Sequence, residues 1–261
     1  MNKLLDLVAL LGAAVLGFVA YLGEVAIFAS TGLSHIFRPP FYPRQVGRAF
    51  MDIGFFSLPV VALTALFTGM VLALQSYNGF SRFSAEGAVA TVVVLSMTRE
   101  LGPVIAALMV AGRVGAAMAA EIGTMRVTDQ IDALTTLSTD PLSYLVLPRL
   151  LAGLVTMPML VLVADIIGVF GGYLVGVYRF DFNPAAYLTN TEQYLELRDV
   201  VSGLVKAGVF GLIVTLMGCY HGYHSQGGAQ GVGQATTYAV VSASVMILVS
   251  DYILTAAFFG R

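Results

Sequence analysis

The chain has 261 residues, of which 58% are hydrophobic and only 11% are charged, and its formal net charge is -2. A soluble domain carries roughly 25% charged residues, so the composition excludes an ordinary soluble protein and predicts a polytopic membrane protein. The absence of a basic or acidic tail argues against nucleic acid binding. A single cysteine, Cys219, excludes an internal disulfide framework.

The first apolar stretch, residues 4 to 28, is longer than the roughly 20 residues that a membrane span requires. It exceeds the apolar core of a secretory signal and contains Asp6 and Glu24, which favours a retained helix. The sequence leaves open whether this helix spans the bilayer or lies at its interface. Residues 35 to 48 form a connector, because three prolines and three arginines do not suit a continued helix.

Five spanning helices are predicted after this connector. They cover residues 53–75, 88–120, 150–177, 200–220 and 238–259. About 33 residues at about 1.5 Å each exceed a core of about 30 Å, so the second span must tilt, bend or project from the membrane. The segment 178–199 is expected to hold a short helix outside the membrane, and 221–237 to form a glycine-rich loop.

The segment 121–141 is the one continuous polar stretch of helical length between two predicted spans. Asp129 is a candidate N-cap, with Asp132 in the first turn, and Asp140-Pro141 is expected to stop the helix. Basic residues near span ends set the orientation of membrane proteins. With Lys3 and the segments 29–50 and 113–149 counted as cytoplasmic, seven basic residues lie inside and four outside, which places 121–141 and 221–237 in the cytoplasm.

Small residues recur at helix-packing spacing in two predicted spans. They are Gly168, Gly172 and Gly176 in the third span and Gly112, Ala116 and Ala120 in the second. Such rows allow two helix backbones to approach closely. They indicate packing inside one bundle or, as the alternative, a homodimer face.

The sequence predicts no enzyme activity in this chain. Its only lysines, Lys3 and Lys206, do not fit a nucleotide-binding GxxxxGK[ST] loop. His221 and His224 fall in the glycine-rich loop with no acidic residue near them in sequence, so we interpret them as part of a flexible loop. Carboxylate sets that could grip a metal are missing from the spans, and no metal site is expected.

Ionisable residues inside the predicted spans are the main candidates for function. They are Arg99, Glu100, Asp165, Lys206 and Asp251. Each costs about 2.5 to 3.5 kcal/mol to insert, so each should face the bundle interior or a wet cavity. Adjacent residues on a helix point about 100° apart, so Arg99 and Glu100 should contact different neighbours. The charges could line a pathway, or Lys206 could pair with Asp251 or Glu100 and fix helix positions.

The central block resembles a known family. The segment TRELGPVIAALMVAGRVGAAMAAEIGTMRVTDQIDALTTLSTDPLSYLVLPRLLAG, with FTGMVLALQ upstream and GAQGVGQATT downstream, is similar to the MlaE/YrbE family, the permease subunits of MCE-type lipid ABC transporters. The resemblance covers essentially the whole chain. It implies an all-α integral membrane fold that forms one domain, residues 1–261, and pairs into a homodimeric permease core. Residues 1–50 would form an interfacial helix and connector, and 51–261 a bundle of five spans.

The resemblance also implies partners and a location. An ABC ATPase subunit, which carries the ATP and Mg, would bind on the cytoplasmic side, and this chain would need no cofactor of its own. The segment 121–141 would be the coupling helix, and a solvated turn is the alternative. Its candidate contacts with the ATPase are Glu121, Arg126, Asp129 and Asp132. An MCE-domain lipid-binding protein would dock on the periplasmic face of a bacterial inner membrane, on residues 76–87 and 178–199.

The substrate implied by the resemblance is a phospholipid, moved between the inner membrane and the MCE partner to maintain outer-membrane lipid asymmetry. The implied lipid path consists of Leu72, Gln75, Phe80, Phe83, Arg99 and Glu100. Apolar side chains suit acyl chains, and arginine suits a phosphate. The direction of transport stays open. The rival hypotheses are an ion-coupled secondary transporter that uses Asp165, Lys206 and Asp251, and a scaffold that only anchors other subunits.

Overall fold

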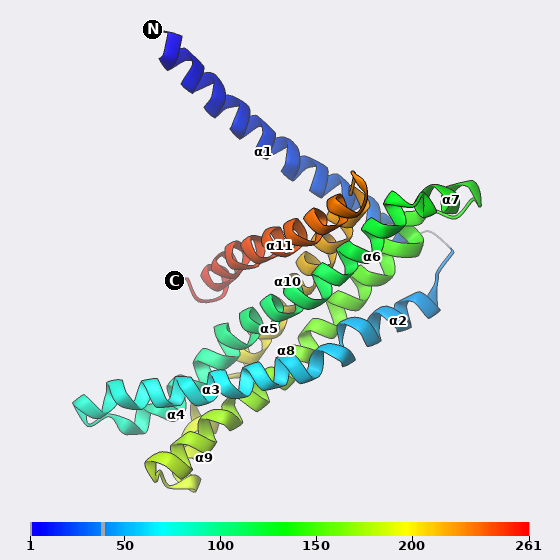
Figure 1. Ribbon diagram of the computed structural model, residues 1–261. Coiled ribbons are helices and arrows are strands. Elements are labelled where there is room, and N and C mark those ends of the chain that lie inside the picture. The colour runs from blue at the N-terminus through cyan, green and yellow to red at the C-terminus, as the bar shows by residue number, and fades with distance from the viewer. Residues whose placement is uncertain (1, 38–39, 261) are drawn as a thin grey trace.

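A computed structural model describes residues 2–37 and 40–260, and within them every regular element is a helix (Figure 1). Six helical segments of this part of the chain are long and apolar enough to cross a membrane. They are Val15–Ser34, Pro43–Phe83, Glu86–Val127, Leu142–Phe180, Leu197–Tyr223 and Gly228–Phe259. The prediction of an all-α integral membrane protein, with an N-terminal membrane helix and five further spans, is confirmed.

Helix α1 (Asn2–Ser34) projects away from the other helices, and only its C-terminal part lies against them (Figure 1). Val25 and Phe28 are buried there, whereas Leu16 is 72% exposed. A long apolar surface of this kind is not stable in water. Lipid or another protein chain therefore has to cover the exposed part of α1.

Helix α2 (Pro43–Ile53) begins with proline at its first position, where the missing N–H costs nothing. The second half of the predicted connector is therefore helical, because a proline that cannot continue a helix can start one. A short 3-10 turn, Phe55–Ser57, joins α2 to α3 (Leu58–Phe80). Between them, a Cβ atom on Gly54 would lie 3.2 Å from Thr156, so glycine lets this corner approach α8 closely.

The second span is interrupted twice. It consists of α4 (Val89–Ser96), a π-helical turn (Met97–Leu101), α5 (Gly102–Val110), a second π-helical turn (Ala111–Gly115) and α6 (Ala116–Val127). Pro103 has no N–H to donate, and π turns are a common response to an interrupted helical ladder. The long span thus departs from a regular α-helix next to Arg99 and Glu100.

The polar segment 121–141 differs from the predicted single helix. Its first residues belong to α6, and only the short α7 (Gln130–Thr136) is a separate helix, at one extreme end of the molecule (Figure 1). Asp129 occupies the N-cap position, but its φ is 58° and its side chain makes no capping hydrogen bond. Helix α7 ends at Thr136, before Asp140-Pro141 is reached, because Ser138 adopts a φ of 58°.

The remaining helices are α8 (Leu147–Phe180), preceded by a π-helical turn at Leu142–Val146, then α9 (Pro184–Tyr194), α10 (Leu197–Tyr223) and α11 (Gly228–Phe259). Asn183 caps α9 by accepting hydrogen bonds from two backbone amides. The prediction that residues 221–237 form a loop is wrong, since only residues 224–227 connect α10 to α11. Gly227, at a φ of 85°, provides the left-handed residue that this tight connection requires.

Close backbone contacts hold the bundle together. Helix α3 packs along α8, and α10 packs between α8 and α11. A Cβ atom on Gly69 would lie 1.8 Å from the Gly168 carbonyl oxygen, and one on Gly168 would lie 2.2 Å from Met97. The glycine row in α8 therefore packs inside this one bundle. Gly112, in contrast, has open space around it.

Candidate functional site

Arg99 and Glu100 lie in the first π-helical turn and contact different side chains, as their divergence on the helix predicts. Arg99 Nε donates a hydrogen bond to Asp199 Oδ1 at 2.8 Å. Asp199 is completely buried in the first turn of α10, where its other oxygen accepts a hydrogen bond from the backbone amide of Glu196. The pair with Asp199 therefore holds Arg99 against the start of α10.

Lys206 lies in α10 and is fully buried. Its ammonium group donates three hydrogen bonds: to Glu100 Oε2 at 2.7 Å, to Thr255 Oγ1 at 2.7 Å and to the Arg99 carbonyl oxygen at 2.9 Å. The Thr255 hydroxyl in turn donates to Glu100 Oε1 at 3.1 Å. Lys206 thus joins the second span to α10 and α11 by saturating all the donors that a lysine has.

Asp251 completes this arrangement by charge rather than by a hydrogen bond. Its Oδ1 lies 2.9 Å from Lys206 Nζ, within ion-pair range. The three N–H groups of Lys206 already have acceptors, so none remains for Asp251. We call Arg99, Glu100, Asp199, Lys206, Asp251 and Thr255 the charge cluster. It contains two cationic and three carboxylate side chains.

The charge cluster has a buried side and an exposed side. The side chains of Lys206 and Asp199 are 0% and 1% exposed, whereas those of Arg99 and Glu100 are 34% and 37% exposed. The Arg99 guanidinium lies 4.6 Å from the centre of the Phe259 ring. Within the part of the chain that the structure describes, the two terminal amino groups of Arg99 make no hydrogen bond. Arg99 is fixed in orientation and has donors available for an anion.

The other predicted lipid-path residues lie on a different element. Leu72 and Gln75 are on α3, Phe80 ends it, and Phe83 ends the 3-10 turn that follows. Leu72 and Phe80 are half-buried, Gln75 is exposed and Phe83 is 81% exposed. Helix α3 packs mainly against α8, α4 and α5, whereas the charge cluster joins the π-helical turn to α10 and α11. No described hydrogen bond or ion pair joins these four residues to the charge cluster.

Asp165 is separate from Lys206 and Asp251. It is buried in α8, and its Oδ1 has no hydrogen-bond partner among the described residues. A Cβ atom on Gly102 would lie 1.9 Å from that oxygen, so the carboxyl group packs directly on the Gly102 backbone. The three intramembrane residues that the sequence grouped together therefore occupy two sites.

The predicted coupling residues gather at the end of the bundle that carries α7. Glu121 Oε2 forms an ion pair with Arg149 Nη2 of α8 at 2.7 Å. Arg126 Nη1 forms an ion pair with Asp132 Oδ1 at 2.8 Å. Asp129 is exposed beside them. Sequence reasoning missed Arg149 as the partner of Glu121. It also missed Asp199 and Thr255, because Asp199 fell in a predicted loop and a lone threonine in a span gives no signal.

Residues 46–257, which include the charge cluster and α7, match the family described as Permease MlaE. The chain belongs to the MlaE permease family.

Relatives of this chain occur in several organisms. A probable ABC transporter permease protein of Rickettsia felis is 61% identical over 98% of this chain and 99% of the relative. The intermembrane phospholipid transport system permease protein MlaE of Haemophilus influenzae is 41% identical over 80% of each chain. A probable ABC transporter permease protein of Synechocystis is 40% identical over 90% of each chain.

Proposed function

We propose that this chain is the membrane subunit of an ABC transporter and that its substrate is a phospholipid. The observation that carries the proposal is Arg99, a partly exposed arginine that two neighbours orient and whose terminal amino groups are available. Arginine recognises phosphate through paired, charge-assisted hydrogen bonds. The name of the Haemophilus influenzae relative supports a phospholipid as the cargo.

The charge cluster gives each residue a role in this proposal. Arg99 binds the lipid phosphate, Asp199 holds its guanidinium, and Lys206 keeps Glu100 beside it. Acyl chains lie on apolar side chains, for which Leu72, Phe80 and Phe83 are the candidates. No described hydrogen bond or ion pair links these residues to the charge cluster, and we propose that two copies of the chain face each other and enclose the lipid between them.

The proposed partners lie at the two ends of the bundle. An ABC ATPase binds the end with α7 in the cytoplasm, and ATP and Mg belong to that subunit. An MCE-domain protein binds the opposite, periplasmic end, near 76–87 and α9, and exchanges lipid with the cavity. In a bacterial inner membrane this transfer serves outer-membrane lipid asymmetry. Names of relatives from Rickettsia and Synechocystis support the ABC assignment.

Ion-coupled transport is less well supported. A relay needs ionisable groups within reach of one another, and Asp165 packs on Gly102 with no described hydrogen bond to Lys206 or Asp251. Lys206 is instead saturated by fixed partners, as in a structural lock. These contacts favour a role of the charge cluster in positioning Arg99.

Reconstitution tests the proposed function. The full chain is placed in liposomes with and without its ATPase, and transfer of a labelled phospholipid to an MCE-domain acceptor is followed. We expect transfer above background only with the ATPase and hydrolysable ATP. An ATP analogue that is not hydrolysed serves as the control. Lipid movement driven by a proton or sodium gradient without ATP would contradict the proposal.

A further inference from the structure

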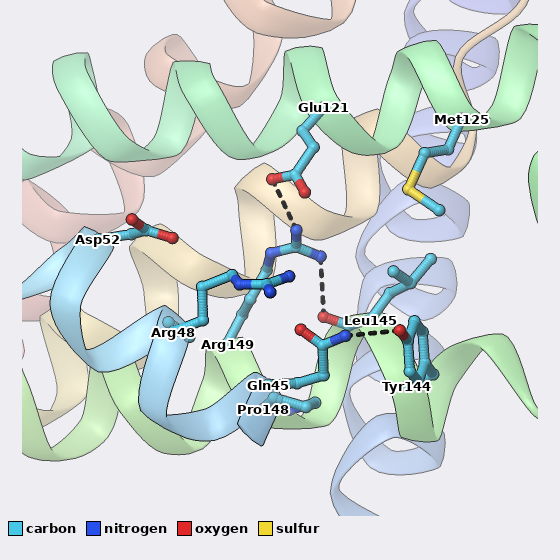
Figure 2. Close-up of a pocket in the computed structure, with 10 residues that line it drawn as sticks. Gln45, Arg48, Asp52, Glu121, Met125, Tyr144, Leu145, Pro148 and Arg149 are labelled. Carbon is cyan, nitrogen blue, oxygen red and sulfur yellow. Dashed lines mark hydrogen bonds and ion pairs between the residues drawn. The ribbon is translucent and has the colours of Figure 1, made fainter. Parts of the chain in front are cut away.

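A second polar site lies at the end of the bundle that carries α7, between α2, α6 and α8 (Figure 2). It is a cleft with a volume of about 220 Å³. An adjoining cavity of about 210 Å³ shares part of its wall and adds Arg113. The residues that matter are Gln45, Arg48, Asp52, Glu121, Tyr144 and Arg149, and we call this site the arginine cleft.

The arginine cleft contains unused positive charge. Arg149 is paired with Glu121 at 2.7 Å, and Arg113 donates to Ser57 Oγ at 2.8 Å. Among the described residues, Arg48 has neither an ion pair nor a side-chain hydrogen bond. Figure 2 shows the guanidinium groups of Arg48 and Arg149 extending into the same space. Glu121 and the Leu145 carbonyl oxygen already engage the two terminal nitrogens of Arg149, and Asp52 also lines the cleft. Arg48 is therefore the guanidinium whose donors are available to an anion, beside the positive charge of Arg149.

Tyr144 provides a further donor in the arginine cleft. Gln45 Nε2 donates a hydrogen bond to the Tyr144 hydroxyl at 2.6 Å, as Figure 2 shows. Because that oxygen accepts, its own O–H is free to donate to a ligand. Arg48 and Tyr144 thus present N–H and O–H donors without described acceptors. Such a donor set fits the oxygen atoms of a phosphate group.

The surroundings of the arginine cleft are apolar, which identifies the source of the phosphate. Phe41, Met51 and Phe55, on and beside α2, are 61%, 48% and 58% exposed. An apolar groove of about 370 Å³, lined by Phe50, Leu58 and Leu160 among others, lies where α2 and α3 meet α8. A short helix that carries exposed arginines and is flanked by exposed apolar side chains is typical of a membrane interface.

We propose that the arginine cleft binds the phosphate of an anionic phospholipid in the cytoplasmic leaflet. This site is distinct from the charge cluster and does not depend on which lipid is transported. The lipid headgroup lies between Arg48, Tyr144 and Arg149, and its acyl chains lie along the exposed side of α2. Because Arg149 also holds Glu121 of α6, the lipid is bound at the helix that leads into α7.

A tryptophan reporter tests the proposal, because the chain contains no tryptophan of its own. Met51→Trp places a fluorophore beside the cleft in the full chain. The protein is reconstituted in nanodiscs that contain either dibrominated phosphatidylglycerol or dibrominated phosphatidylcholine in a background of ordinary lipid. At equal content of brominated lipid, we expect phosphatidylglycerol to quench the tryptophan fluorescence more strongly than phosphatidylcholine does. One arginine near an anionic membrane surface raises the binding affinity about fivefold. Arg48→Gln should therefore lower the preference for phosphatidylglycerol about fivefold.

Matched variants distinguish lipid binding in the cleft from the general attraction between surface arginines and anionic lipid. Arg44→Gln removes the same charge one turn earlier on α2, outside the cleft, and should lower the preference less than Arg48→Gln does. Tyr144→Phe removes only the hydroxyl and should lower the preference about threefold, the scale of one hydrogen bond. If Arg48→Gln does not fold, Tyr144→Phe decides the result, because it keeps the size and charge of the site.

Three results would overturn the proposal. The first is an unchanged lipid preference in Arg48→Gln and Tyr144→Phe, or an equal loss in Arg44→Gln. The second is displacement of phosphatidylglycerol by inorganic phosphate at about 50 mM, which would make soluble phosphate the ligand, since salt of that kind should screen only exposed charges. The third is loss of ATPase assembly in Arg48→Gln with the lipid preference intact, which would make the cleft a protein contact.

Discussion

Lys206 Nζ lies 2.7 Å from Glu100 Oε2 and is completely buried between the second span, α10 and α11. The same ammonium group lies 2.9 Å from Asp251 Oδ1. A buried charge is tolerated only where partners surround it. This contact therefore links the π-helical turn that carries Arg99 to α10 and α11.

Lys206→Met should destabilise the protein strongly. The substitution preserves apolar volume but leaves Glu100 and Asp251 without their cation, and breaking a buried pair costs about 3 kcal/mol. Thermal unfolding in detergent measures the effect. The double variant Lys206→Met with Glu100→Gln should recover a part of the loss, because it removes one orphaned charge. A single variant as stable as the unaltered protein would show that the contact is not structural.

Gly102→Ala should also destabilise the bundle. The new Cβ atom would lie 1.9 Å from Asp165 Oδ1 and 2.8 Å from the Met97 carbonyl oxygen, so α8 or the π-helical turn must shift. Overpacking of this kind costs about 1 to 3 kcal/mol. Gly112→Ala is the matched control, since nothing lies near its Cβ position, and alanine favours helix over glycine. Equal behaviour of the two variants in an unfolding titration would contradict the packing of Asp165 on Gly102.

Tyr187 in α9 should tolerate loss of its hydroxyl. The group is buried without a described hydrogen-bond partner, and burial raises the pKa of Tyr187 to about 12. Tyr187→Phe should leave the free energy of unfolding unchanged or raise it by about 1 kcal/mol, because an unsatisfied polar group is removed. Tyr194→Phe, at a half-exposed position of α9, is the control. A loss of stability in Tyr187→Phe alone would reveal an unrecognised hydrogen bond.

The same pKa gives a pH dependence. Tyrosine ionises near pH 10 in an unfolded chain, whereas Tyr187 stays neutral up to about pH 12 in the folded protein. Its contribution to stability is complete below pH 10 and is lost as the pH rises to about 12. The tyrosinate absorbance of the folded protein between pH 10 and pH 11 should therefore be nearly the same in Tyr187→Phe as in the unaltered protein. A Tyr187 that ionises near pH 10 would contradict its burial.

The membrane class and the spans could be predicted because hydropathy depends only on local composition. The divergence of Arg99 and Glu100 was also predictable, since it follows from helix geometry alone. Asp199 and Thr255 could not be identified as partners, because a residue in a predicted loop and a lone threonine in a span give no signal that they contact residues about 100 and 155 positions away. The glycine-rich segment before Tyr238 was expected to be a loop, but packing of α11 against α10 and α6 makes it helical. Tertiary contacts overrode local propensity there.

The most direct test of the phospholipid proposal is the transfer rate of Arg99→Gln in ATP-driven transport by the reconstituted complex. Losing a charge-assisted contact to phosphate should slow transfer about tenfold or more, with assembly and ATP hydrolysis retained. Arg179→Gln, an exposed arginine at the end of α8 outside the charge cluster, is the control and should transfer at the normal rate. Normal transfer by Arg99→Gln would contradict a role for Arg99 in binding the lipid.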